Sequence, residues 1–305
     1  MNEIIYILTG PTGVGKTEIA VNWAETNGAE ILSCDSLLVY SGMDVGTAKP
    51  STESMRRIPH HGINVVDLTS AYSIGDYVKL AENSIREIQE KGDKALVVGG
   101  SSFYLRCFFS PVVDDMKIPE AVTEQVERLN TKKGLDGLVL ELTRLNPLGL
   151  GELDTRNPRR VANALKRCLA SGKTVNALKE AFLEGRSPFA DFRKQVCCLM
   201  RSPEDLRSRI EDRTRAMMEA GLVEEVNFLI SKGIKSNPTA ASAIGYRETI
   251  AYLNGDISLE KLEKEIIQNT IALAKKQLKS IRKQIPIDRE VNLIGGERVE
   301  ELFLE

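Results

Sequence analysis

The first third of the chain alternates short apolar runs with longer amphipathic segments. The apolar runs have the length and composition of buried strands and cover Ile4–Leu8, Ile31–Cys34, Ile63–Val66 and Ala95–Val98. The amphipathic segments predict helices over 16–27, 75–91 and 102–109. Alternation of this kind is typical of a parallel sheet that helices cover on both faces, so we expect an α/β core over residues 1–115.

From about residue 116 the pattern becomes helical throughout. Helices are expected over 119–130, 135–145, 158–170 and 174–184, with no convincing strand among them. The segment 158–170 is the clearest, because Asn157 suits the N-cap and Pro158 suits the first helical position. Its apolar stripe contains Val161, Ala164, Leu165, Cys168 and Leu169, which turns outward Arg159, Arg160, Asn163, Lys166 and Arg167. Residues 116–194 are therefore predicted to form an all-helical insertion domain.

Strand composition returns at Gln195–Met200, which predicts that the chain re-enters the sheet there. Helices are expected over 203–219, 222–232, 239–253 and 258–283, separated by Gly221, Gly233 and Gly255. Residues 291–294 have the composition of a final strand. The core domain is thus predicted to comprise residues 1–115 and 195–305.

The composition is that of an ordinary water-soluble protein. The chain has 305 residues, of which 42% are hydrophobic and 28% charged, enough for one sizeable core and a smaller second one. The N-terminus lacks the features of a signal peptide, and no run of 18 apolar residues occurs. We therefore expect a cytoplasmic protein without a membrane span.

Cysteine and histidine are expected to be structural. The five cysteines are an odd number without C-x-x-C spacing, so we expect reduced, mostly buried thiols at Cys34, Cys107, Cys168, Cys197 and Cys198. The only histidines, His60 and His61, are adjacent, and neighbouring side chains seldom converge on one metal. Local hydrogen bonds in a loop are the favoured interpretation of this pair over a catalytic role.

The net charge of −2 is distributed unevenly. Residues 116–195 contain fifteen Lys and Arg against ten Asp and Glu, so this segment is +5 and the rest of the chain is −7. One acid-free stretch holds Arg156, Arg159, Arg160, Lys166, Arg167 and Lys173, and a second holds Lys275, Lys276, Lys279, Arg282 and Lys283. Either stretch alone is as readily a solvated helix face as a phosphate-binding surface. The two together favour a polyanionic partner.

A phosphate-binding motif stands between the first predicted strand and the first predicted helix. Residues 10–17 spell G-x-x-x-x-G-K-[ST], and the predicted phosphate cradle consists of Gly10, Pro11, Thr12, Gly13, Val14, Gly15, Lys16 and Thr17. The glycines let backbone amides surround a diphosphate, and Lys16 adds a full positive charge. The Thr17 hydroxyl is suited to Mg2+. The motif does not say which phosphate compound binds.

Two further strand ends are predicted to face this cradle. Asp35 follows the second strand, where a carboxylate can coordinate Mg2+ through water, orient a nucleophile or take its proton. The alternative for Asp35 is a helix or turn cap. Val98-Gly99-Gly100-Ser101 ends another strand, at the position where a nucleotide hydrolase usually has an aspartate for its Mg2+.

Several strings together resemble the tRNA dimethylallyltransferase family. They are residues 10–17, Asp35-Ser36, Tyr40–Pro50, Ile58–His61, Val98–Gly100 with Tyr104, and Ala243–Glu248, and the resemblance runs from residue 4 to about 283. It implies a P-loop NTPase-like parallel sheet whose cradle holds dimethylallyl diphosphate rather than ATP. The implied acceptor is N6 of adenosine 37, immediately 3′ of the tRNA anticodon, and the insertion would hold the anticodon stem-loop.

The resemblance also implies roles for individual residues. Asp35 would be the general base, while Lys16, the loop amides, Thr17 with Mg2+, and Arg213 would stabilise the leaving diphosphate. The implied catalytic residues are Asp35, Ser101, Thr17 and Arg213. The implied tRNA-binding residues are Asp35, Ser36, Leu37, Leu38, Ser101, Val122, Arg159, Arg160 and Asn163. A chain with its own RNA-binding insertion is expected to work as a monomer.

Departures from the family pattern cluster in the tRNA-facing part. Ser101 replaces the usual threonine and keeps its hydroxyl, and the insertion helix has Asn157, Asn163 and Lys166 where the family has Asp, Arg and Glu. The other departures are Val122, Ile271, Lys276 and Ser280. Because the diphosphate-site residues are kept, these changes suggest a divergent paralogue with an altered set of tRNAs.

Three alternatives to tRNA prenylation stay open from the sequence. An adenylate prenyltransferase would use a free nucleotide as acceptor, although a mononucleotide needs no basic helical insertion. A P-loop small-molecule kinase would bind and consume ATP. A non-enzymatic RNA-binding protein would keep RNA affinity without turnover.

Overall fold

The computed structural model describes residues 3–112, 116–293 and 302–303 of the chain. It divides into a core unit, Met1–Phe109 with Pro188–Glu305, and a helical unit, Ser110–Ser187. The helical unit therefore starts and ends earlier in the sequence than the predicted insertion, 116–194. The reason at its C-terminal end is Phe189, which is buried with its ring 4.6 Å from that of Phe108 and so belongs to the core unit.

The core unit contains one six-stranded parallel sheet. Its strands are β1 (Ile4–Thr9), β2 (Ala29–Ser33), β3 (His60–His61), β4 (Lys94–Gly99), β5 (Arg193–Met200) and β6 (Arg289–Asn292). The strand order is β3-β2-β4-β1-β5-β6, and every pairing is parallel. The predicted P-loop type of parallel sheet is confirmed, and β1, which leads into the phosphate-binding motif, lies inside the sheet.

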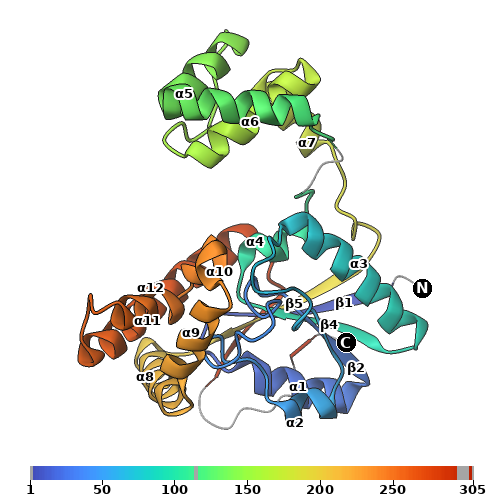
Figure 1. Ribbon diagram of the computed structural model, residues 1–305. Coiled ribbons are helices and arrows are strands. Elements are labelled where there is room, and N and C mark those ends of the chain that lie inside the picture. Colours follow the sequence, from blue (N-terminus) through green and yellow to red (C-terminus); the bar gives the residue numbers. More distant parts are fainter. Residues whose placement is uncertain (1–2, 113–115, 294–301, 304–305) are drawn as a thin grey trace. The chain divides into compact units, whose positions relative to one another are not determined.

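Helices cover both faces of this sheet, as the nearly continuous burial of its inner strands requires. Figure 1 shows α1 (Lys16–Asn27) on one side of the sheet and α3 (Ile74–Glu90) on the other. The chain moves along the sheet in one direction from β1 to β2, through α1, and in the other direction from β3 to β4, through α3. Because crossovers between parallel strands are right-handed as a rule, these opposite directions place the two helices on opposite faces.

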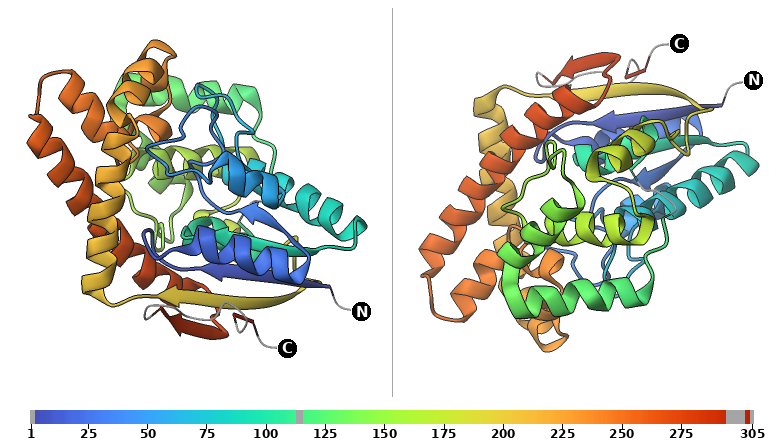
Figure 2. Two further views of the ribbon diagram at one scale, coloured as in Figure 1. Left: turned by 90° about the horizontal axis from the view of Figure 1, so that it is seen from below. Right: turned by 90° about the horizontal axis from the view of Figure 1, so that it is seen from above.

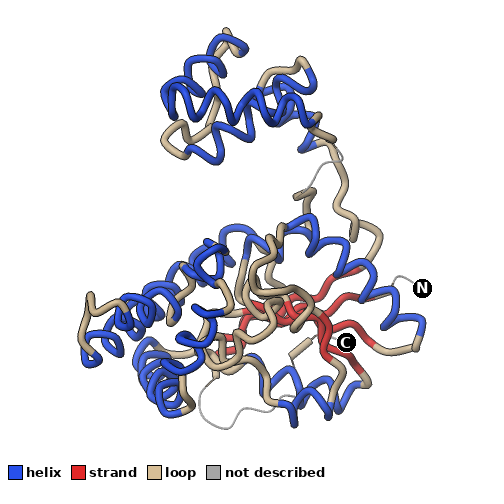
Figure 3. Tube along the Cα trace, viewed as in Figure 1, coloured by secondary structure: helices blue, strands red, loops and turns tan. Residues whose placement is uncertain are grey.

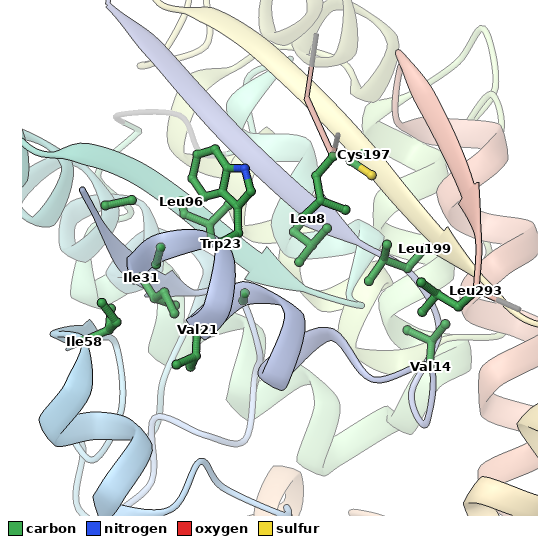
Figure 4. Packing of buried hydrophobic residues seen from close by; sticks show 14 residues of the cluster. Leu8, Val14, Val21, Trp23, Ile31, Ile58, Leu96, Cys197, Leu199 and Leu293 are labelled. Atoms are coloured by element: carbon green, nitrogen blue, oxygen red, sulfur yellow. The ribbon is translucent and has the colours of Figure 1, made fainter. Parts of the chain in front are cut away.

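The packing beneath α1 centres on the single tryptophan of the chain. Trp23 is buried, and its ring centroid lies 5.0 Å from that of Tyr6 and 4.9 Å from that of Phe303. Figure 4 shows Trp23 with Leu8, Ile31 and Leu96 from three neighbouring strands. Val14, in the phosphate-binding motif, packs in the same cluster, so the loop is anchored to the core.

The second half of the core unit is a group of helices that pack beside the sheet (Figure 2). The remaining helices of this unit are α2 (Thr52–Arg57), α4 (Ser102–Leu105), η1 (Arg106–Phe108), α8 (Pro203–Glu219), α9 (Leu222–Ser231), η2 (Ile234–Ser236), α10 (Pro238–Ala241), α11 (Tyr246–Leu253) and α12 (Leu259–Gln284). A hydrophobic cluster that includes Tyr40, Leu222, Tyr246 and Ile266 joins α9, α11 and α12 to the loop after β2.

The helical unit consists of α5 (Glu120–Leu145), α6 (Pro158–Ser171) and α7 (Val175–Leu183) (Figure 3). The helix α5 is interrupted at Gly134, whose φ of 61° and ψ of −158° are not helical. This interruption agrees with the two separate helices predicted over 119–130 and 135–145. Asn157 caps α6 by accepting a hydrogen bond from the Arg160 amide at 3.1 Å. Val161, Leu165 and Cys168 form the buried face of α6, which confirms the predicted stripe.

Three element predictions were wrong or misplaced. Ile63–Val66 is not a strand, because Gly62 and Asn64 adopt left-handed φ values of 78° and 55°. The strand in this part of the chain is β3, His60–His61, and Val66 makes only an isolated bridge with Tyr40. The predicted helix 239–253 breaks into α10 and α11 at Gly245, whose φ is 91°. The final strand is β6, two residues ahead of the predicted start; residue 294 lies outside the described residues.

The cysteines are free and buried, as predicted. The histidines lie in a strand rather than a loop, and only one of them bonds locally as predicted. His60 Nδ1 lies 2.7 Å from the Ile58 carbonyl, whereas His61 Nε2 lies 2.6 Å from the carboxylate of Glu30 on the neighbouring strand β2. Among the described residues, no helix combines the length and apolarity that crossing a membrane demands.

Candidate active site

The phosphate-binding motif forms a tight loop between β1 and α1. Gly10, Gly13 and Gly15 have φ values of 142°, 81° and 99°, a region that favours glycine. A Cβ on Gly10 would lie 2.5 Å from the Leu199 carbonyl oxygen, so the loop also approaches β5 too closely for a side chain. Because Gly15 starts α1 without a side-chain cap, the first amides of the helix are open to an anion.

The Lys16 ammonium lies over this loop. Its Nζ donates hydrogen bonds of 2.8 Å to the carbonyl oxygens of Gly10 and Pro11. Burial lowers the pKa of Lys16 to about 8; the Asp35 charge opposes this shift, and the Arg213 charge adds to it. A bound anion would relieve the cost of this buried charge.

Asp35 stands at the carboxyl end of β2, where the sequence placed it. Its Oδ1 accepts a hydrogen bond of 2.9 Å from the Leu37 amide, so the turn-cap alternative describes part of its role. The ends of β2 and β4 meet here: a Cβ on Gly99 would lie 2.1 Å from the Cys34 carbonyl oxygen. Glycine at the end of β4 therefore lets Asp35 lie beside the phosphate-binding loop.

Arginines from α8 and the loop before it contact the phosphate-binding loop. Arg213 Nη1 lies 3.5 Å from the Thr12 hydroxyl, and Arg213 Nη2 donates to the Thr47 carbonyl at 3.2 Å. Arg209 donates to the Gly13 carbonyl at 3.1 Å, and Arg201 donates to the Val14 carbonyl at 2.8 Å. Burial lowers the pKa of Arg213, and the Asp35 charge opposes this shift.

The side chains of Lys16, Asp35, Arg209 and Arg213 share one cavity of about 640 Å³. The predicted site residues that line it are Thr12, Gly13, Gly15, Lys16, Thr17, Asp35, Leu37, Leu38 and Arg213. Gly10, Pro11 and Val14 complete the loop behind this lining. Ser36 and Ser101 are not part of the lining; Ser101 follows the cavity residue Gly100 directly and stands at the N-terminus of α4.

The cavity has an apolar wall beside its charged end. Leu37, Met217, Ile244 and Ile266 contribute to it from four separate segments. A ligand with both a phosphate group and a small hydrocarbon group would match these two kinds of surface.

The remaining predicted tRNA-binding residues lie on the helical unit. Arg159, Arg160 and Asn163 are exposed on α6, as the amphipathic pattern predicted, whereas Val122 is half-buried on α5. Lys166 is not a free positive charge, because its Nζ pairs with Glu127 at 3.1 Å.

Two further departures from the family pattern, besides Lys166, have structural partners. Asn157 provides the N-cap of α6, so the change from aspartate preserves that function. Ser280 on α12 lies 2.7 Å from the Ser102 hydroxyl and accepts a hydrogen bond of 2.7 Å from Gln284. Ser280 thus joins α12 to the start of α4, the helix that follows β4.

Several residues at the site were not predicted from the sequence, among them Gln277, Arg209 and Glu225. Gln277 on α12 accepts a hydrogen bond of 2.8 Å from the Thr12 amide and lines the cavity. Arg209 also lines the cavity, and its spacing of four residues from Arg213 on one helix was the available signal. Glu225 accepts hydrogen bonds from the amides of residues 44–46, in the loop whose Thr47 carbonyl contacts Arg213, and no local motif marks it.

The parallel sheet, the loop after β1 and the cavity at the carboxyl ends of the strands define the chain as a P-loop protein. The sequence profile of the IPP transferase family matches residues 38–284. A curated relative from Opitutus terrae, named tRNA dimethylallyltransferase, is 49% identical over 286 residues, which are 94% of this chain and 92% of the relative. A second relative with the same name, from Geobacter metallireducens, is 34% identical over 283 residues, which are 93% of this chain and 91% of the relative. The chain therefore belongs to the IPP transferase family, a family of enzymes.

Solved structures agree with this assignment. The crystal structure of the tRNA isopentenylpyrophosphate transferase from Bacillus halodurans has a TM-score of 0.70 and 29% identity, covering 99% of this chain and 94% of its own. A eukaryotic dimethylallyltransferase acting on tRNA has a TM-score of 0.82 at 23% identity, covering 98% of this chain and 76% of its own, and supports the fold.

Proposed function

We propose that this protein transfers the dimethylallyl group of dimethylallyl diphosphate to N6 of the adenosine immediately 3′ of the anticodon in tRNA. The observation that carries the proposal is a single cavity in which a phosphate-binding loop, the Asp35 carboxylate and the Arg213 guanidinium lie together. Membership of the IPP transferase family and the names of its curated relatives support it.

The proposed chemistry forms one carbon–nitrogen bond and breaks one carbon–oxygen bond. N6 of the adenosine attacks the terminal allylic carbon, and the electron pair of the broken bond leaves with the diphosphate. Asp35 accepts the proton that N6 loses, for which an ionised carboxylate within hydrogen-bond reach is needed. Negative charge grows on the leaving diphosphate, and Lys16, Arg213 and the loop amides stabilise it.

The donor set fits Mg2+. The Thr17 hydroxyl lines the cavity and makes no hydrogen bond to another described side chain or backbone group, and Asp35 supplies carboxylate oxygens in the same cavity. Hydroxyl, carboxylate and phosphate oxygens are the ligands that Mg2+ prefers. We propose that Thr17 holds the ion; when bound, it supplies further charge stabilisation to the diphosphate.

The substrate groups are assigned to the two kinds of cavity surface. The diphosphate would lie on the loop of residues 10–17, and the dimethylallyl group would pack against Met217, Ile244 and Ile266. Leu37 and Leu38, beside Asp35, would contact the adenosine. Ser101 keeps its proposed catalytic and tRNA-binding role by resemblance.

The helical unit is proposed to bind the anticodon stem-loop. Arg159 and Arg160 are exposed on α6 and would contact RNA phosphates, with Asn163 one turn further along the same helix. Val122 has no hydrogen-bonding side chain and would offer only van der Waals contact. We also propose that the enzyme works as a monomer in the cytoplasm, where its tRNA substrate is found.

The experiment supplies dimethylallyl diphosphate, labelled in the dimethylallyl group, and Mg2+ to the purified protein with either bulk tRNA or AMP. The proposal predicts label in tRNA, recovered as N6-modified adenosine after digestion. Labelled AMP with blank tRNA would instead identify an adenylate prenyltransferase. Consumption of ATP with a small acceptor, and no transfer of label, would identify a kinase.

A further inference from the structure

One carboxylate on α9 is surrounded by four hydrogen-bond donors. Glu225 accepts from the backbone amides of Asp44, Val45 and Gly46 at 2.9, 2.7 and 3.1 Å, and from the Tyr246 hydroxyl at 2.7 Å. Three consecutive amides around one anion form the kind of backbone concavity that binds negative charge strongly. Glu225 therefore fixes the position of residues 44–46.

The Tyr246 ring fixes the same loop from another side. Tyr246 is fully buried at the start of α11, and a Cβ on Gly46 would lie 2.6 Å from two carbons of its ring. The Gly46 backbone thus lies directly on the ring, and only glycine fits there. Two sequence motifs that carry the family resemblance, Tyr40–Pro50 and Ala243–Glu248, meet at this contact.

The next residue along the loop contacts the catalytic cavity. The Thr47 carbonyl accepts a hydrogen bond of 3.2 Å from Arg213, whose other terminal nitrogen lies 3.5 Å from the Thr12 hydroxyl. A carbonyl orients a guanidinium without cancelling its charge, whereas a carboxylate in the same place would compete with a bound diphosphate. The Glu225 carboxylate instead binds the amide of Gly46, one residue before Thr47 in the sequence.

We propose that Glu225 is a positioning residue for Arg213. By holding residues 44–46, it places the Thr47 carbonyl so that the Arg213 guanidinium points to the phosphate-binding loop. The inference rests on the proposed function, which assigns Arg213 to the diphosphate. Positioning matters because small displacements of a charged group from its productive geometry cost large factors in rate.

The test is a double-mutant cycle between Glu225→Gln and Arg213→Met. The amide of glutamine turns a donor group toward the loop amides, so the loop loses part of its anchor while the side-chain size stays the same. We measure the Kd for inorganic diphosphate with Mg2+, the KM for dimethylallyl diphosphate and the Kd for tRNA. Glu224→Gln, an exposed change on the same helix, is the matched control.

In the wild-type background, Glu225→Gln is expected to raise the Kd for diphosphate and the KM for dimethylallyl diphosphate about tenfold, as for one weakened charge-assisted contact. The Kd for tRNA and all constants of the Glu224 variant stay unchanged. In the Arg213→Met background, Glu225→Gln has no further effect, because the group that it positions is gone.

Tyr246→Phe removes one of the four donors and keeps the ring, so it provides a milder variant that retains the fold. It is expected to raise the same two constants in the wild-type background and not in the Arg213→Met background. Equal factors in both backgrounds, or no change in the wild-type background, would overturn the inference. A wild-type protein that binds no diphosphate and modifies no tRNA would refute the proposed function instead.

Discussion

The depressed pKa of Lys16 predicts that the binding of dimethylallyl diphosphate takes up a proton. Burial lowers this pKa from 10.5 to about 8 in the ligand-free protein. A diphosphate on the loop places negative charge next to the ammonium and raises the pKa again. At pH 8 about half of the free protein has a neutral Lys16, so binding should take up about half a proton per site.

The measurement is titration calorimetry of dimethylallyl diphosphate in buffers of different ionisation enthalpy. Proton uptake should be close to zero at pH 6.5, reach about half a proton at pH 8 and approach one proton at pH 9. The affinity should then fall about tenfold for each pH unit above 8. Lys16→Arg is the matched control, since a guanidinium does not titrate in this range and shows neither effect. Equal proton uptake in the wild-type protein and the Lys16→Arg variant would refute the reasoning.

Lys16, Asp35 and the arginines of α6 can each be tested by substitution. Lys16→Met should raise the free energy of unfolding of the ligand-free protein at pH 7 by up to about 3 kcal/mol, because it removes a buried charge whose pKa is lowered from 10.5 to about 8. This gain should shrink as the pH rises from 8 to 10.5, where the unfolded wild-type lysine also loses its proton. Denaturant unfolding over this pH range tests the prediction, and a gain that does not depend on pH contradicts it. Asp35→Asn should lower kcat by about 10² to 10⁴ in single-turnover assays while tRNA binding persists, and unimpaired turnover would remove Asp35 from the role of base. Replacing Arg159 and Arg160 by glutamine should reduce the salt dependence of tRNA binding by about one to two phosphate contacts, and an unchanged slope would place the RNA elsewhere.

Residues whose role depends on local sequence were predicted well. The motif at residues 10–17 specifies its own turn through its glycines, and Asp35 follows a buried strand, so the rule that parallel strands end at one edge of the sheet brings them together. The capped, amphipathic helix α6 was predicted to within one residue for the same reason. In each case the deciding interactions lie within a few residues of one another.

The failures arise either from local backbone geometry that composition does not reveal or from contacts between distant parts of the chain. The run at residues 63–66 has strand composition, but the left-handed turn at Asn64 breaks it, and Val65 is 46% exposed. Gln277 contacts the Thr12 amide from the other end of the sequence, and neither residue has a local pattern that indicates the pairing. Glu225 is likewise an ordinary helical glutamate until the fold brings residues 44–46 to it.

Transfer to one defined adenosine is the central claim, and a pair of synthetic anticodon stem-loops tests it most directly. One carries adenosine immediately 3′ of the anticodon, and the other carries guanosine there and is otherwise identical. Each is incubated with the purified protein, dimethylallyl diphosphate and Mg2+, digested to nucleosides and analysed by mass spectrometry. We predict N6-dimethylallyl adenosine from the first RNA and none from the second; no product from the first RNA, or equal product from both, would contradict the account.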